Sequence, residues 1–144
     1  MKKLLFFLVF AAAALSVNGA PQKVDFDKLP QNSREFIQRN FPREKVKSVE
    51  MDRQSSWDKY TVYFTNGDQV SFEGGSGDWS EIIMKNGYVP AAVIPSKINT
   101  FTANEYPAMR IVRLETTNDG YRAGLSDGTS LYFDKDGNYT KATR

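Results

Sequence analysis

The chain has 144 residues, with 19 basic and 17 acidic side chains, no histidine and no cysteine. Histidine and cysteine carry most proton-transfer, nucleophilic and zinc-binding chemistry near neutral pH, so their absence excludes Ser-His and Cys-His catalytic sites and the common zinc sites. It also excludes disulfides. The small net charge gives no basic surface of the kind that nucleic acid requires, so we expect no nucleic-acid partner.

The first twenty residues, MKKLLFFLVFAAAALSVNGA, have the layout of a secretory signal peptide, with two lysines, an apolar stretch from Leu4 to Val17 and then small residues. We expect cleavage after Gly19, so that residues 1–19 are the signal peptide and the mature protein is periplasmic or secreted. The apolar stretch is shorter than the roughly 20 residues of a membrane span, and we expect no span after the signal is removed. Without a cysteine at the junction, a lipid anchor is also excluded.

The mature chain begins with a helix signal. Pro30 suits the first turn of a helix, and Pro42 marks its end. Apolar residues between and beside these prolines recur at helical spacing and predict a helix with one buried face. They are Leu29, Phe36, Ile37 and Phe41.

Strand signals follow the helix. Residues 60–64 and 70–72 alternate between apolar and polar side chains, and Asn66-Gly67 between them predicts a two-residue hairpin turn. Further strands are expected at about 46–52 and about 79–84. The alternation predicts an antiparallel sheet with one buried and one wet face.

The same order of signals then recurs. Pro95 and Pro107 bracket a second helix, and Asp127-Gly128 joins the arms of a second hairpin within residues 121–133. Strands are expected at about 110–117 and 138–142. The two copies align at an offset of 65 residues in the helices and 61 in the hairpins, and a repeat of this kind indicates two units of one architecture. We therefore predict an α+β protein of two tandem repeats, residues 20–90 and 91–144, each a helix region packed on a four-stranded antiparallel sheet.

The motifs of turns and core positions occur in this order: Leu29-Pro30, Phe41-Pro42, Tyr60-x-Val62, Asn66-Gly67, Phe72, Gly77-x-Trp79, Ile94-Pro95, Tyr106-Pro107, Gly120-Tyr121, Asp127-Gly128 and Phe133-Asp134-x-x-Gly137. From about Asp25 to Thr140 the chain resembles the PepSY-like proteins secreted by Bacteroidetes, a family also described as beta-lactamase-inhibitor-like. The resemblance implies doubled helix-on-sheet units and carries no catalytic residues. Related PepSY domains are associated with the restraint of peptidases, which implies an inhibitor-like role.

Carboxylates are the remaining candidates for catalysis or metal binding. Most of them lie in or beside predicted turns, where aspartate has its own role in capping the backbone. The run DKDGN at 134–138 is similar to a calcium loop, but its glycine comes too early and no glutamate closes it, so a hairpin turn is favoured. We predict no catalytic residue, no metal, no cofactor and no enzyme. An enzyme that uses two converging carboxylates is the alternative.

Binding is the better candidate for the function. Strand alternation directs Tyr63, Arg122 and Tyr132 away from the helices, and Trp57 lies in a turn before the first hairpin. Tyrosine, tryptophan and arginine are enriched at protein interfaces. We predict these four as the binding residues of a non-catalytic module whose partner is an extracytoplasmic protein, for example an enzyme that it inhibits. Two alternatives stay open: the aromatic rings stack on a small ligand or glycan of the cell envelope, or they only stabilise the sheet.

Overall fold

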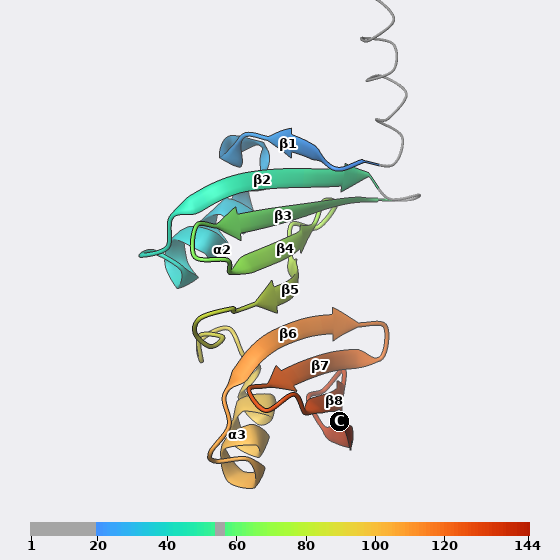
Figure 1. The fold of residues 1–144 in the computed structure, drawn as a ribbon. Helices are drawn as coiled ribbons and strands as arrows, with labels where there is room; N and C mark the ends of the chain where they lie inside the picture. The colour runs from blue at the N-terminus through green and yellow to red at the C-terminus, as the bar shows by residue number, and fades with distance from the viewer. Residues whose placement is uncertain (1–19, 54–56) are drawn as a thin grey trace, which may run out of the picture.

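The computed structural model describes residues 20–53 and 57–144, and the predicted signal peptide lies outside these residues (Figure 1). It is an α+β fold with one antiparallel sheet of nine strands, which follow one another in chain order. The elements are β1 (Gln22–Val24), the 3-10 helix η2 (Phe26–Lys28), α2 (Gln31–Asn40), β2 (Val46–Arg53), β3 (Asp58–Phe64), β4 (Gln69–Glu73), β5 (Trp79–Ile83), α3 (Ser96–Glu105), β6 (Ile111–Thr117), β7 (Gly120–Leu125), β8 (Ser130–Asp134) and β9 (Tyr139–Thr143).

The prediction of one four-stranded sheet for each repeat is wrong, because all nine strands form a single sheet. β5 pairs with β6 through three residue pairs centred on Ile82 and Leu114, and the Met84 N–H donates to the Val112 carbonyl at 2.8 Å. β1 pairs with β2 and adds a ninth strand. Two separate sheets would leave β5 and β6 as open edges with unpaired backbone groups, and their pairing satisfies those groups.

The order of one helix and four strands nevertheless occurs twice. α2 and α3 each have ten residues, and each begins directly after a proline, Pro30 or Pro95. Each ends at an aromatic residue, Phe41 or Tyr106, whose N–H donates to a carbonyl four residues earlier at 2.8 Å. The predicted offset of 65 residues is therefore found in the backbone as well, and the division at residue 90 stays a prediction.

One core lies beneath both helices. The strand register aligns a row of side chains across β2 to β8, all at most 2% exposed. They are Val49, Val62, Val70, Ile82, Leu114, Ala123 and Leu131. Phe36 of α2 packs edge-on against Phe72 at 5.6 Å, and Phe101 of α3 against Phe133 at 5.7 Å. Because side chains of one row point to one side of a sheet, both helices cover the same face, and Figure 1 shows α2 behind β2, β3 and β4.

The two predicted hairpins have three-residue loops and not the predicted two. The Phe64 N–H donates to the Asp68 carbonyl at 2.9 Å, which encloses residues 65–67, and the Leu125 N–H does the same with Thr129 at 2.8 Å. A two-residue type I′ turn needs two successive residues with positive φ. Among the described residues only glycines have positive φ, +96° at Gly67 and +93° at Gly128, so each loop has one such residue and takes the longer form.

Candidate functional site

The candidate site is the face of the sheet opposite the two helices, which we call the open face. Two rows of side chains cross it in register. The first runs through Lys23, Glu50, Thr61, Ser71, Glu81, Glu115, Arg122, Tyr132 and Lys141. The second runs through Ser48, Tyr63, Gln69, Ile83, Arg113, Gly124, Ser130 and Thr143.

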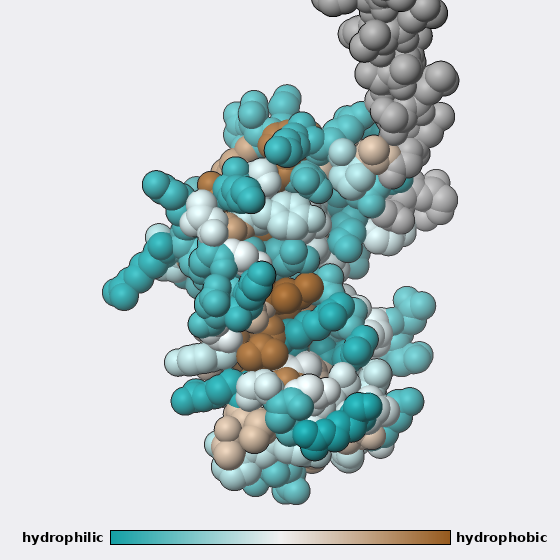
Figure 2. All heavy atoms as spheres, in the orientation of Figure 1, coloured by the Kyte–Doolittle hydropathy of each residue, from teal (hydrophilic) through white to brown (hydrophobic). Residues whose placement is uncertain are grey.

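On β3 and β4, two hydroxyl side chains of the open face lie close together. Ser71 is only 1% exposed, although neither described α-helix covers this side of the sheet. Its hydroxyl oxygen lies 3.0 Å from that of Thr61. In Figure 2 apolar atoms gather at the level of β5, where the two halves meet, and the ends of the molecule are mostly hydrophilic.

Four charged residues on β5, β6 and β7 form what we call the charge cluster: Glu81, Arg113, Glu115 and Arg122. Glu81 and Glu115 are cross-strand neighbours, and like charges in that position destabilise a sheet. An arginine offsets each of them, since Arg113 Nη2 lies 2.5 Å from Glu81 and Arg122 Nη1 lies 3.1 Å from Glu115. Each carboxylate is thus occupied by a cation, whereas a glycosidase pair needs one carboxyl that is free to donate a proton.

Arg122 and Tyr132, two of the four predicted residues, lie together. They are cross-strand partners, and the Arg122 guanidinium carbon is 5.9 Å from the centre of the Tyr132 ring. Lys141 lies next in the same row, with its Nζ 4.9 Å from that ring. The ring of Tyr132 therefore lies beside two cations, and each cation is attracted to the electron-rich face of the ring. These contacts hold the ring in place.

Tyr63 and Trp57 lie elsewhere. Tyr63 is on β3, five strands from Tyr132, which corresponds to about 24 Å at the usual strand spacing. Burial and the nearby Glu50 carboxylate raise the pKa of Tyr63 above its ordinary value. Trp57 is 49% exposed and precedes β3, so it lies at the opposite end of that strand from Tyr63. The four predicted residues are therefore spread over the molecule and do not form one compact site.

The predicted binding residues do not include Glu81, Arg113, Glu115 and Lys141 of the open face. The alternation of Glu81 with Ile82 and of Arg113 with Leu114 indicates which side chains face outward. The alternation does not reveal that β5 pairs with β6, and only this pairing brings the two glutamates together.

The loop at 134–138 is a hairpin turn, as predicted. Asp134 Oδ1 accepts hydrogen bonds from the backbone N–H groups of Asn138 at 2.8 Å and Asp136 at 3.0 Å, and these bonds lower the pKa of Asp134. Within residues 20–53 and 57–144, no group of three or more acidic side chains is placed to hold a metal ion.

Helices long and apolar enough to cross a membrane do not occur among the described residues.

The fold defines a class of α+β proteins in which helix-and-four-strand units share one antiparallel sheet. Residues 15–57 and 58–141 match the family described as "Putative beta-lactamase-inhibitor-like, PepSY-like". The chain belongs to this PepSY-like family, as its turn and core motifs predicted. Among curated proteins there is no match.

Solved structures of similar proteins come from Bacteroides. A "putative periplasmic protein" of the DUF2874 family from Bacteroides vulgatus is 31% identical, with a TM-score of 0.82 over 86% of this chain and 97% of that one. A "putative calcium-regulated periplasmic protein" from Bacteroides thetaiotaomicron is 30% identical, with the same TM-score and coverage. A third, from Bacteroides vulgatus and described as of unknown function, is 28% identical, with a TM-score of 0.81 over 87% of this chain and all of its own. These relatives confirm that the protein is periplasmic or secreted.

Proposed function

We propose that this chain is a non-catalytic binding protein that uses the open face to bind an extracytoplasmic protein, and that inhibition of an enzyme is one form of this function. The observation that carries the proposal is the strip of polar and charged side chains that crosses all nine strands, with both helices on the other face. At the usual strand spacing the strip is about 38 Å wide. That width suits a protein interface, which covers about 800 Å² on each partner.

Within this surface, Arg122 and Tyr132 are the proposed centre of binding. An ion pair with Glu115 holds Arg122 in place, and cations from β7 and β9 contact the Tyr132 ring. Arginine and tyrosine that are already ordered lose little entropy on binding, and such residues are typical interface hot spots. Tyr63 and Trp57 become part of the interface only with a partner broad enough to reach them.

Glycan or small-ligand binding on the open face is the alternative. Such sites are concave pockets. Two surface hollows, about 300 and 410 Å³ in volume, are lined by residues of α3 and its neighbours and by none of the four predicted binding residues. The broad open face therefore favours a protein partner over a ligand there.

We do not extend calcium regulation from the Bacteroides thetaiotaomicron relative to this chain. The one loop with a calcium-like sequence uses the Asp134 carboxylate to hold its own backbone, with Oδ2 also accepting a bond from the Asn138 side chain at 3.2 Å.

Site-specific photo-crosslinking tests the proposal. A photoreactive amino acid replaces Tyr132 or Tyr63 in the full chain, expressed in its native cell envelope. Exposed helix residues Gln38 and Asn104, on the opposite side of the molecule, serve as matched positions. We expect one protein adduct from Tyr132, and from Tyr63 as well if the interface spans the sheet. The captured protein then binds the Arg122→Ala, Tyr132→Ala double variant about 30-fold more weakly, as loss of a hot spot predicts.

The Tyr132→Phe variant is the control for the double variant, because it keeps the ring and loses only the hydroxyl. Adducts of equal yield from the helix positions, or none from the open face, would contradict the proposal. Capture of glycan in place of protein would favour the alternative.

A further inference from the structure

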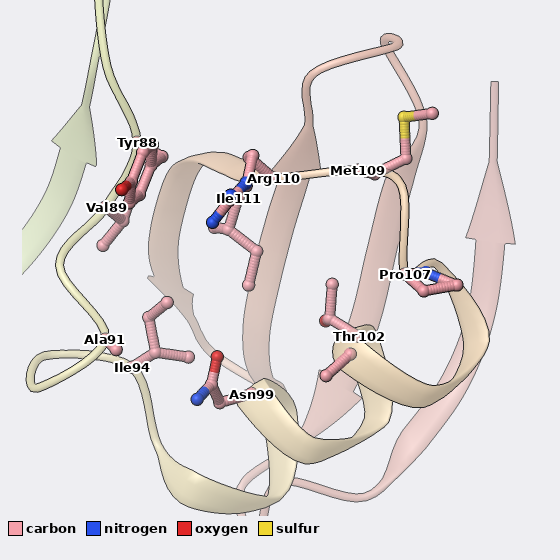
Figure 3. A pocket seen from close by; sticks show the side chains of 11 residues that line it. Tyr88, Val89, Ala91, Ile94, Asn99, Thr102, Pro107, Met109, Arg110 and Ile111 are labelled. Carbon is pink, nitrogen blue, oxygen red and sulfur yellow. The ribbon is translucent and has the colours of Figure 1, made fainter.

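A feature independent of the proposed function lies on the side of the sheet that the helices cover. A hollow of about 300 Å³ opens between α3, the segment before it and the start of β6, and we call it the α3 pocket. Its lining consists of Tyr88, Val89, Ala91, Ile94, Asn99, Thr102, Ala103, Pro107, Met109, Arg110 and Ile111. In Figure 3 the side chains of Ile94, Asn99 and Thr102 are directed toward Ile111, with Tyr88 and Arg110 at the rim.

The first half of the chain has a larger side chain at the matching place. Before α2, the Leu29 N–H donates to the Phe26 carbonyl at 3.1 Å; before α3, the Ile94 N–H donates to the Ala91 carbonyl at 3.2 Å. The offset of 65 residues that relates the helices also relates these two turns. Phe26 and Ala91 therefore occupy matching positions, and Phe26 packs against the core.

Further matching positions also carry smaller residues in the second half. Ile37, buried in α2, corresponds to Thr102 in α3. Arg34, whose guanidinium donates to the Leu29 carbonyl at 2.6 Å, corresponds to the shorter Asn99. An aromatic ring and part of an aliphatic side chain are thus missing beside α3, and this difference leaves the hollow.

The hollow has an apolar floor and a cationic rim. Ile94, Thr102 and Ile111 at the floor are buried, and the Thr102 hydroxyl donates to the Ile98 carbonyl at 2.9 Å, so its polar group is satisfied within the helix. At the rim the Arg110 guanidinium carbon lies 4.7 Å from the centre of the Tyr88 ring, which is 54% exposed. Within the described part of the chain, Arg110 is in none of the ion pairs.

We infer that the α3 pocket binds an aromatic ring that carries a carboxylate on a short arm. The ring takes the place that Phe26 fills in the first half, above Ala91 and Thr102. The carboxylate pairs with Arg110, whose planar fork fits a carboxylate with two parallel hydrogen bonds. The volume is at the lower end of the roughly 300–1,000 Å³ of ligand sites, which suits one ring and a short arm. This chemistry has two sources, a free aromatic acid and an aromatic residue at the end of a peptide chain.

NMR titration of the 15N-labelled mature chain tests the inference. The probes are 3-phenylpropionate for a free acid, N-acetylphenylalanine for a chain end, and N-acetylphenylalanine amide as the uncharged match. We expect shifts at the amides of Ala91, Asn99 and Arg110 with at least one of the two acids, and affinity at least tenfold lower for the amide. Whichever acid binds more tightly identifies the source.

Two variants separate the ring from the charge. Ala91→Phe copies Phe26, so it fills the pocket and abolishes binding with no loss in melting temperature. Its matched control is Ala92→Phe, an exposed neighbour that does not line the pocket and keeps binding. Arg110→Gln leaves the floor intact and lowers the affinity of the acid about tenfold, to that of the amide.

The inference is overturned if no pocket amide shifts at about 10 mM probe, a concentration that fills even a millimolar site. The pairing of the carboxylate with Arg110 is overturned if the amide binds as tightly as the acid, or if Arg110→Gln leaves the affinity for the acid unchanged. The position of the ligand ring above Ala91 is overturned if a folded Ala91→Phe variant binds the acid as tightly as the wild type does.

Discussion

At the scale of single residues, Glu44 and Asp68 bring two carboxyl groups together beside the first hairpin loop. Asp68 is buried, and its Oδ1 accepts the Lys85 N–H at 2.6 Å. Burial, the charge of Asp68 and a hydrogen bond with it raise the pKa of Glu44 from 4.5 to about 7. The second half has Met109 and Thr129 at the matching positions, so this acidic pair belongs to the first half alone.

The raised pKa of Glu44 predicts a pH-dependent stability. Between pH 4.5 and about 7 the folded protein binds a proton at Glu44 that the unfolded chain has released, so this stabilisation is complete below pH 4.5 and is lost as the pH rises through 7. Because the side chain is partly exposed, we expect a loss of about 1 kcal/mol and not the full value of the shift. Glu44→Gln keeps a neutral group at every pH, so its free energy of unfolding should rise relative to that of the wild type as the pH rises.

The measurement is the free energy of unfolding by urea at pH 4.5, 6 and 8 for wild type and Glu44→Gln. The difference between the two should grow with pH, to about 1 kcal/mol at pH 8. Glu105→Gln, at the exposed end of α3, is the control for the removal of a negative charge. A difference that stays flat across the pH range refutes the assignment of the shift to Glu44.

At the scale of secondary-structure elements, one aromatic side chain of β9 packs against α3. All five of its residues are exposed, and its outer edge is the end of the sheet. Tyr139 is 43% exposed, yet its ring stacks on Phe101 of α3 at 4.4 Å and meets Phe133 edge-on at 6.2 Å. Tyr139 thus joins the last strand to the helix beneath it.

Removal of that ring should loosen β9 by itself. We expect Tyr139→Ser to raise the rate of backbone hydrogen exchange in residues 139–143 about tenfold, since an aromatic pair contributes about 1 kcal/mol beyond its buried area. Exchange in β6 and β7 should change much less. Tyr139→Phe keeps the ring and should exchange as wild type does. Equal acceleration in all strands would show instead that β9 opens only when the whole sheet unfolds.

The elements also show what the sequence can and cannot predict. The two hairpins were predictable because the alternation of apolar and polar side chains shows which face of the sheet each residue is on. Asn66-Gly67 and Asp127-Gly128 mark the turns. Arg122 and Tyr132 were predictable as neighbours for the same reason. β1 has only three residues and no pattern of its own, since it is ordered by pairing with β2. The charge cluster depends on the pairing of β5 with β6 across α3, and no local pattern encodes that pairing.

At the scale of the whole molecule, the row of buried side chains from β2 to β8 makes one core of the two halves. The pairing of Ile82 with Leu114 joins them at the centre, and both residues are fully buried. A core and a sheet that are both continuous predict one cooperative unfolding transition, as is usual for domains of this size. Both tryptophans, Trp57 and Trp79, lie in the first half, so fluorescence reports that half and far-UV circular dichroism reports the whole.

Leu131→Ala in β8 tests the cooperativity from the half without tryptophan. Leu131 is fully buried, so we expect a loss of about 3 kcal/mol from the smaller side chain and the cavity it leaves. If the molecule unfolds as one unit, the urea midpoint of tryptophan fluorescence falls together with that of circular dichroism, although the change lies four strands from β4. Val70→Ala in β4 is the matched change in the first half and should also move both signals. Independent halves would give the opposite result: Leu131→Ala would leave the fluorescence midpoint in place and divide the circular dichroism curve into two steps.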